Sequence, residues 1–259
     1  MGSKQKRLQT TVAAIQLRWG TKALRQGPPA WPTSATVPHL PTGFPRLDQA
    51  LAGIGGIPLN RFTELLGTPT SGMVTLALKI IAQAQVQGHT AAYVDVAATF
   101  DPDYATRCEI DLSRLLLVRP TNGLEALEIV HTLVIQRSIS VLVFADVAHL
   151  FATSFGPQIL SAALRQIPPV LASSNCAVLF LTPLQVNRVM SATNYPSGFA
   201  LPHYATVRLY LKKEKWLRKG GDVRGYQAQV QVLKNKLGPA GRTAKIAITF
   251  NGVVRGDGT

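Results

Sequence analysis

The sequence predicts an α/β fold, in which a mostly parallel sheet carries helices on both faces. Residues 61–87 combine a short apolar run, a loop with two glycines and an apolar-periodic stretch, which predicts strand, turn and helix. The run Val141–Asp146 is continuously apolar and ends in an acid, as in a strand buried on both faces. The length of 259 residues, 46% of them hydrophobic, suits one such domain with a small appendage.

The appendage is expected at residues 1–32, and the core domain at residues 33–259. Apolar side chains spaced among Arg and Gln in residues 4–26 predict a short basic amphipathic helix with a turn at Gly20. Residues 27–32, Gly-Pro-Pro-Ala-Trp-Pro, break any helix and indicate a linker. The helix is either a docking arm or a segment that folds back onto its own domain.

The segment 61–87 has the frame of a P-loop, because Gly67 and Gly72 stand five positions apart between strand and helix. In such a loop, backbone N–H groups at the helix N-terminus cradle phosphates. The motif then requires Lys and a Ser or Thr, but Met73 and Val74 follow here. A thioether and a hydrocarbon carry no charge and do not bind Mg²⁺. The pattern indicates a nucleotide site without its chemistry, although a plain strand–turn–helix has the same glycines.

Charge is unevenly distributed along this chain of net charge +14. Residues 1–27 hold six basic and no acidic side chains, and residues 205–259 hold twelve basic and three acidic ones. The stretch between them is nearly neutral. Such a localised positive surface favours a polyanionic partner, although basicity for solubility alone remains open.

The composition also limits compartment and metal chemistry. No apolar run reaches membrane-spanning length, and the N-terminus lacks a signal peptide's apolar core, so we expect a cytoplasmic protein without membrane contact. Cys108 and Cys176 lie far apart in apolar surroundings, which predicts buried reduced thiols. The five histidines show no ligand spacing, so no metal site is expected.

Several segments in order resemble the RecA recombinase family. Residues 41–67 resemble its entry to the core, with a Thr-Gly turn, a Leu-Asp-x-Ala-Leu helix and a Gly-Gly turn before the strand. Residues 91–120 and 122–134 resemble its second strand region and next helix, and Val141–Asp146 resembles its Walker B strand. Residues 203–252 resemble its last strands. The likeness covers about residues 8–254 and implies a RecA-type core with a small antiparallel extension, without the family's C-terminal domain.

This resemblance implies that four polar functions of phosphoryl transfer are lost. The phosphate-binding Lys falls on Met73, the Mg²⁺-binding hydroxyl on Val74, the water-activating Glu on Ala97 and the γ-phosphate-sensing Gln on Pro183. We therefore expect no ATPase activity and no cofactor, and at most weak binding of ATP or ADP. The vestigial nucleotide site comprises Gly67, Ser71, Gly72, Met73, Val74, Thr75, Asp101, Tyr104 and Asp146.

Some positions of the family's sites are retained. Asp101 and Tyr104 match its adenine-holding pair, although a core Tyr beside the helix explains Tyr104 equally well. Asp146 matches the Walker B acid. Lys234 and Lys236 match a pair that reaches a neighbouring subunit's ATP, so the chain is hypothesised to dock on an active RecA subunit and supply them in trans. Contact of these lysines with DNA or solvent is an equal alternative.

The resemblance also places two DNA-binding loops. The first, after Leu150, is lost or shortened, since a predicted helix follows almost directly and then breaks at Pro168-Pro169. The second spans about residues 184–202 and offers rings for base stacking. Trp216 lies among cations at a predicted hairpin turn, which indicates either a nucleic-acid platform or a solvated hairpin with one packed ring. The expected DNA-binding residues are Arg188, Tyr195, Phe199, Arg208, Lys212, Lys213, Lys215, Arg218, Lys219 and Arg224.

The predicted function is that of a non-catalytic accessory protein in DNA repair, recombination and the SOS response to DNA damage, most similar to the ImuA-like proteins of translesion synthesis. It would bind DNA, more readily single-stranded, and a RecA-type recombinase or a translesion polymerase subunit, with homo-oligomers possible at the nucleoid. One alternative is an ATP-binding recombinase acting on single-stranded DNA. Another is a protein-binding inhibitor of the SOS type, such as a division inhibitor.

Overall fold

The structure is a computed structural model, and it describes residues 2–21, 23–24, 37–151, 156–184, 200–251 and 253–255. The chain divides into two units, Met1–Thr33 and Ser34–Thr259. The first contains helix α1 (Gly2–Trp19), which is followed by Gly20 at φ 84°. The helix and the turn predicted at Gly20 are both present, because Gly20 adopts the left-handed conformation that ends helices; the helix begins two residues before the predicted segment of residues 4–26. The predicted linker lies mostly outside the described residues.

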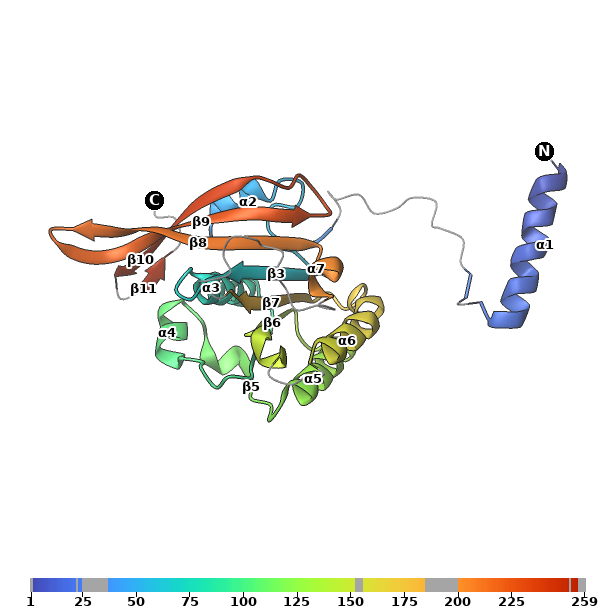
Figure 1. Cartoon of the computed structure of the whole chain (residues 1–259), viewed down its shortest axis with the longest axis horizontal. Coiled ribbons are helices and arrows are strands. Elements are labelled where there is room, and N and C mark those ends of the chain that lie inside the picture. The colour runs from blue at the N-terminus through green and yellow to red at the C-terminus, as the bar shows by residue number, and fades with distance from the viewer. Residues whose placement is uncertain are drawn as a thin grey trace. The chain divides into compact units, whose positions relative to one another are not determined.

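The second unit contains one large sheet. Among the described residues, nine strands form it in the order β11-β10-β9-β8-β3-β7-β6-β4-β5 (Figure 1). The strands are β3 (Phe62–Gly67), β4 (Ala91–Asp95), β5 (Leu115–Val118), β6 (Val141–Ala145), β7 (Ala177–Pro183), β8 (Val207–Lys219), β9 (Asp222–Asn235), β10 (Thr243–Asn251) and β11 (Val253–Arg255). The strands β1 (His39–Leu40) and β2 (Ile57–Pro58) form a separate antiparallel pair.

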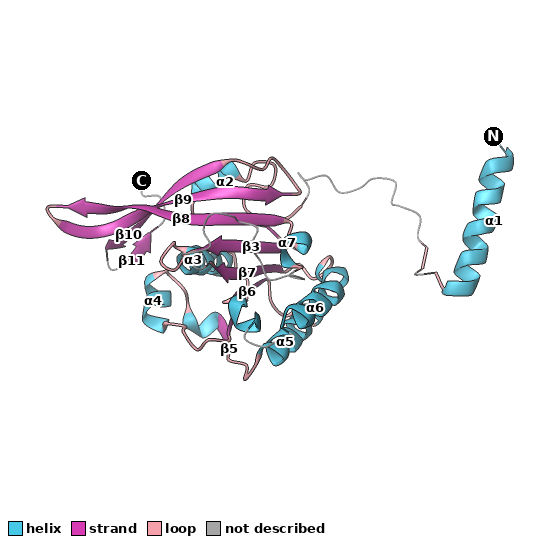
Figure 2. Ribbon diagram, in the orientation of Figure 1, coloured by secondary structure: helices cyan, strands magenta, loops and turns pink. Residues whose placement is uncertain are grey.

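Helices occupy both sides of the sheet (Figure 2). They are α2 (Pro45–Ala50), α3 (Met73–Val86), α4 (Pro102–Arg107), α5 (Gly123–Ile135), α6 (Gly156–Leu171) and α7 (Leu201–Tyr204), with the 3-10 helices η2 (Leu112–Arg114) and η3 (Val147–Phe151). Within the part of the chain that the structure describes, no helix combines the length and apolarity needed to cross a membrane.

The pairing confirms the predicted α/β architecture. From β8 through β3, β7, β6 and β4 to β5 all neighbours are parallel. From β8 through β9 and β10 to β11 all neighbours are antiparallel, which is the predicted extension. In this arrangement the carboxyl ends of the parallel strands meet at one edge of the sheet, where ligand sites of such folds lie.

Alternating side chains build two cores, because successive residues of a strand point to opposite faces. On one face, α2, α3 and α4 pack with residues such as Leu65, Val143 and Leu209. On the other face, α5, α6 and α7 pack with residues such as Phe144 and Phe180. The second core contains none of the described residues of β8, β9 or β10, so the antiparallel extension buries apolar side chains only on the α3 face.

The strands β8 and β9 form a long hairpin whose tip extends beyond the rest of the core (Figure 1). Lys219 pairs with Asp222 across the turn, and both turn residues, Gly220 and Gly221, have positive φ, at 59° and 90°. Glycine adopts both conformations without strain, and a turn of this kind matches the twist of the two strands. The predicted hairpin turn is confirmed.

The prediction that Pro168 and Pro169 break the helix after Walker B is wrong. Helix α6 continues through both prolines to Leu171. Each proline removes one backbone N–H that would bond to the preceding turn, but the carbonyls beyond them are still used, since Ala172 N donates to Pro168 O at 3.0 Å. The apolar stripe that includes Leu164 and Leu171 is buried and holds this end of the helix against the sheet.

Candidate functional site

The loop between β3 and α3 has the backbone of a phosphate-binding loop. Gly72 is the N-cap of α3 with φ 100°, and Thr70 also lies in the left-handed region at φ 65°. Gly67 ends β3, where a Cβ atom would lie 2.3 Å from Ser71 Oγ and 2.7 Å from Leu211 O. Glycine is thus required at both ends of the loop, for conformation at Gly72 and for close approach at Gly67.

Apolar and internally bonded groups occupy the first turn of α3. Met73 is buried, and Val74 is 44% exposed toward the adjoining cavity. Thr75 Oγ1 lies 2.6 Å from Tyr104 Oη, so this hydroxyl already has a partner. Ser71 N donates to Thr68 O at 3.1 Å, which occupies one of the loop's donors. The first turn of α3 thus offers neither the ammonium nor the Mg²⁺-binding hydroxyl that a triphosphate with Mg²⁺ requires, so that group does not fit these residues.

A cavity of about 460 Å³ opens above this loop. It lies beyond the carboxyl ends of β3, β6 and β7, since Thr68, Asp146 and Pro183 all line it. Its other lining residues are Pro69, Thr70, Ser71, Gly72, Met73, Val74, Thr75, Tyr93, Thr99, Tyr104, Ala145, Leu181, Lys213, Trp216, Tyr226 and Phe250. The lining is thus dominated by rings and apolar side chains.

The antiparallel extension supplies an aromatic wall to this cavity. The ring of Tyr226 lies 6.1 Å from that of Trp216 and 5.8 Å from that of Phe250, measured between centroids. Lys213 Nζ lies 3.9 Å from the centroid of Trp216, a cation–π contact. A Cβ atom at Gly72 would lie 3.0 Å from Tyr226 Oη, so the wall stands directly against the phosphate loop.

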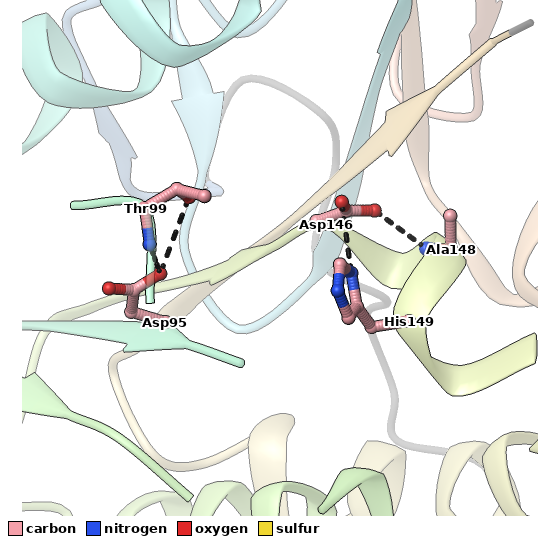
Figure 3. Close-up of polar contacts among 5 residues, drawn as sticks. All are labelled: Asp95, Thr99, Asp146, Ala148 and His149. Carbon is pink, nitrogen blue, oxygen red and sulfur yellow. Dashed lines mark hydrogen bonds and ion pairs between the residues drawn. The ribbon is translucent and has the colours of Figure 1, made fainter. Parts of the chain in front are cut away.

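Two acids at strand ends accept hydrogen bonds from the turns that follow them (Figure 3). Asp95 is buried, and its carboxylate accepts hydrogen bonds from Thr99 N at 2.9 Å and from Phe100 N at 3.0 Å. Asp146 has φ 61°, and its carboxylate accepts from Ala148 N at 3.0 Å and lies 3.1 Å from His149 Nδ1. Each acid therefore stabilises the turn that follows its strand.

Other predicted site residues have structural partners as well. Asp101 is the N-cap of α4, where its Oδ1 accepts from Tyr104 N at 3.0 Å. Tyr104 lines the cavity, and desolvation raises the pKa of its hydroxyl to about 12, with the hydrogen bond from Thr75 opposing the shift. Asp101 and Tyr104 are thus hydrogen-bonded to one another, and of the two only Tyr104 lines the cavity.

Arg208 is partly buried and has its partner inside the sheet. Glu64 on β3 pairs in register with Arg208 on β8, and Arg208 Nε donates to Glu64 Oε2 at 2.6 Å. Thr182 Oγ1 on β7 donates to Glu64 Oε1 at 2.9 Å. The charge of Arg208 thus balances a fully buried carboxylate, which leaves this predicted DNA contact engaged within the sheet.

Lys234 and Lys236 bind the last carbonyls of helix α7. Lys234 Nζ donates to Pro202 O at 2.7 Å and to His203 O at 3.1 Å, and Lys236 Nζ donates to His203 O at 3.2 Å. Burial lowers the pKa of Lys234, and the neighbouring charges of Lys236 and Arg208 lower it further. Cations at a helix C-terminus satisfy unpaired carbonyls, so the pair has a role within its own chain.

The remaining cations of the predicted DNA-binding set lie along the β8–β9 hairpin. Five of them are exposed, namely Lys212, Lys215, Arg218, Lys219 and Arg224. Arg224 Nη2 donates to Asp222 Oδ2 at 3.1 Å, which reduces its availability. Arg188, Tyr195 and Phe199 lie outside the described residues, as does most of the predicted second loop.

Sequence reasoning missed three contributors to this region. Glu64 carried a usable signal, because an acid inside the apolar run Phe62–Leu66 requires a buried partner. Tyr226 and Phe250 carried none, since their contact with the loop depends on how β9 and β10 lie beside it. Within the described residues, no three His, Cys, Asp or Glu side chains gather as metal ligands.

A parallel sheet with a glycine loop leading into a buried helix defines the P-loop NTPase class of cores, here with an altered loop. The family described as RecA N-terminal domain matches residues 6–255. Protein RecA of Thermus thermophilus is 38% identical over 267 residues, which covers 96% of this chain and 77% of that protein. Protein RecA of Chloroflexus aurantiacus is 35% identical, with 96% and 74% coverage. The chain belongs to the RecA family.

Proposed function

We propose that this chain is a non-catalytic RecA-family protein that serves DNA recombination or repair by binding DNA and a protein partner. Membership of the RecA family implies a role in DNA recombination or repair, together with DNA binding and oligomerisation. A cytoplasmic location at the nucleoid is consistent with this role and with DNA binding. Within the family, the narrower assignment is an accessory protein of translesion synthesis, acting with a RecA-type recombinase or a polymerase subunit during the SOS response.

The observation that carries the non-catalytic assignment is the first turn of α3. Met73 and Val74 stand where phosphoryl transfer requires an ammonium and a Mg²⁺-binding hydroxyl. The cavity above them is lined mainly by apolar and aromatic side chains. Positioning and charge neutralisation supply nearly all of the catalysis in this chemistry, so the loss of both removes its basis.

The test is Mg²⁺-dependent ATP hydrolysis by the purified chain, with and without single-stranded DNA. A host strain that lacks its own recombinase excludes contamination. We expect a rate at background in both conditions. Robust hydrolysis that follows the protein through gel filtration would refute the non-catalytic assignment and favour the ATP-binding recombinase.

The hairpin β8–β9 supports the DNA-binding part of the proposal. Its exposed Lys212, Lys215, Arg218 and Lys219 form a cationic surface, and contact with backbone phosphates carries no sequence preference. Affinity for an oligonucleotide should therefore fall steeply with salt and vary little with sequence. A protein-binding inhibitor on the same fold predicts no salt-sensitive DNA binding, so one titration separates these two functions.

Lys236 supports a role with a recombinase partner. Lys234 is half-buried with two carbonyl partners, whereas Lys236 is exposed and makes a single, longer bond to His203 O. Lys236 is thus the member of the pair that is free enough to reach a neighbouring subunit. In this proposal the chain docks on the ATP-bearing face of an active RecA-type subunit and ends or modifies a filament.

A further inference from the structure

Strand β8 contributes both to the wall of the cavity and to the cationic hairpin. In a regular strand Lys213 and Trp216 would point to opposite faces, because they are three residues apart. The register between β8 and β9 shifts between Lys213 and Lys215, which marks an extra residue on β8. This bulge brings Lys213 and Trp216 to the same face, where both line the cavity.

The chemistry of the lining selects a flat, weakly charged group. Tyr93, Tyr104, Trp216, Tyr226 and Phe250 contribute rings, and the volume of about 460 Å³ lies within the range of sites for small ligands. Lys213 is the single Lys or Arg among the lining residues that the structure describes. One ammonium matches one negative charge, whereas a free triphosphate carries several.

The acid in the lining lies far from this ammonium. Asp146 follows β6, which is three strand positions from β8 in the sheet. Because neighbouring strands lie about 4.8 Å apart, the strand that carries Lys213 and the strand that Asp146 follows are separated by roughly 14 Å across the sheet. An anionic group at Lys213 therefore avoids Asp146, while the exposed cation Arg218 lies farther along the same strand, toward the hairpin turn.

We propose that this cavity receives one nucleotide of single-stranded DNA, with its base among the rings and its phosphodiester at Lys213. A nucleotide within a strand combines a planar aromatic group with a single negative charge, which is the combination that the lining matches. The flanking phosphates then extend toward the hairpin turn, where Arg218 lies. This inference rests on the proposed DNA binding and names where a base is held.

An aromatic side chain of a protein partner is the competing occupant. It would pack among the rings equally well. However, it has no negative charge to pair with Lys213, and it is not part of a polyanion that could bind the cations of the hairpin. The observations therefore favour a nucleic acid strand, and the experiment below separates the two.

The experiment compares two oligomers of equal charge, an oligothymidylate of about 12 nucleotides and its abasic counterpart. A Trp19→Phe/Trp31→Phe background leaves Trp216 as the sole tryptophan of the chain. We expect oligothymidylate to quench Trp216 fluorescence and to bind about tenfold more tightly than the abasic oligomer, because stacking adds to the phosphate contacts. Saturating Mg²⁺-ATP should not displace it.

Matched variants locate the site. Val74→Phe fills the cavity and should abolish the preference for bases, whereas Val86→Phe, on an 80% exposed position of the same helix, should not. Lys213→Gln should reduce the slope of log affinity against log salt by about 0.7, without loss of thermal stability. Lys212→Gln, on the opposite face of β8, should weaken the binding of both oligomers alike and leave the preference for bases intact.

The outcomes separate this inference from the proposed function. If neither oligomer binds at any salt concentration, the DNA-binding function itself fails. If both oligomers bind equally and Val74→Phe changes nothing, the base pocket is refuted while DNA binding stands. If Lys213→Gln leaves quenching and salt slope unchanged in a folded protein, the phosphate assignment is refuted independently of the cavity-filling variant.

Discussion

Glu64 Oε2 and Arg208 Nε lie 2.6 Å apart in the centre of the sheet, where the two residues are register partners on the parallel strands β3 and β8. Glu64 is completely buried, and Thr182 binds its second oxygen. This ion pair joins the strand of the phosphate loop to the first strand of the hairpin. It therefore links the two parts of the molecule that build the cavity.

Removing Arg208 should destabilise the fold. Arg208→Gln leaves the Glu64 carboxylate buried without its cation, and loss of one partner of a buried pair costs about 3–5 kcal/mol of unfolding free energy. Urea denaturation measures the change. The double variant Glu64→Gln/Arg208→Gln should recover much of the loss, because no charge is then buried. A stability of Arg208→Gln equal to that of the unchanged chain would contradict this account.

Restoring the loop's side chains should restore nucleotide binding without hydrolysis. Met73→Lys/Val74→Thr returns the ammonium and the hydroxyl, but Ala97 and Pro183 still lack the groups that activate water and sense the γ-phosphate. Isothermal titration with Mg²⁺-ATP should detect binding that the apolar control Met73→Leu/Val74→Ile lacks. Phosphate release should stay at background for both variants. Rapid turnover by the restored loop alone would show that the other two positions are dispensable.

Stability should fall at alkaline pH. Burial raises the pKa of the Cys108 thiol from 9.0 to about 11, with nearby Lys79 and Tyr104 opposing the shift, and burial raises the pKa of Tyr104 from 10.0 to about 12. The folded values exceed the unfolded ones, so the stability from these groups is complete below pH 9 and is lost as pH rises through about 11 and 12.

Urea midpoints measured between pH 7.5 and about 11 test this direction. Cys108→Ala removes one of these titrations, and its midpoint should decline less over the range in which the thiol ionises. Cys176→Ala should flatten the profile in the same way, because burial raises the pKa of Cys176 to about 12 and its thiol also ionises first in the unfolded chain. Identical pH profiles for Cys108→Ala and the unchanged chain would rule out the thiol as a contributor.

Lys236 should affect a partner recombinase more than it affects folding. Added in excess to a RecA-type protein that hydrolyses ATP on single-stranded DNA, the chain should change the hydrolysis rate severalfold. Lys236→Ala should lose much of this effect and Lys236→Arg should keep it, while both melt as the unchanged chain does. If all three proteins change the hydrolysis rate equally, Lys236 has no role at the partner, and its contact with His203 O is purely structural.

Local features of the fold were predictable from the sequence, and distant ones were not. The strand Phe62–Gly67 and the helix Met73–Val86 followed from apolar periodicity and two glycines, all within one short segment. The hairpin turn at Gly220 and Gly221 was local in the same way. Pro168 misled, because the apolar stripe of α6 outweighs a proline placed near the helix end.

The candidate site was predictable only in its loop. Nothing in the spacing of Lys213 and Trp216 indicates that they share a face, because the bulge that realigns them depends on the pairing with β9. Arg208 has the appearance of a surface cation in the sequence, and only the register with Glu64 shows otherwise. Contacts between strands far apart in the chain determine these positions, and a single sequence carries little information on them.

The helix α3 is buried along nearly its whole length, from Met73 to Gln85. Interior packing of this helix therefore anchors the loop that precedes it. Within this one segment, the buried residues maintain the fold, and the residues of the first turn determine the chemistry of the site. A lineage can exchange the first turn of α3 and redirect the site to a new task without having to rebuild the domain.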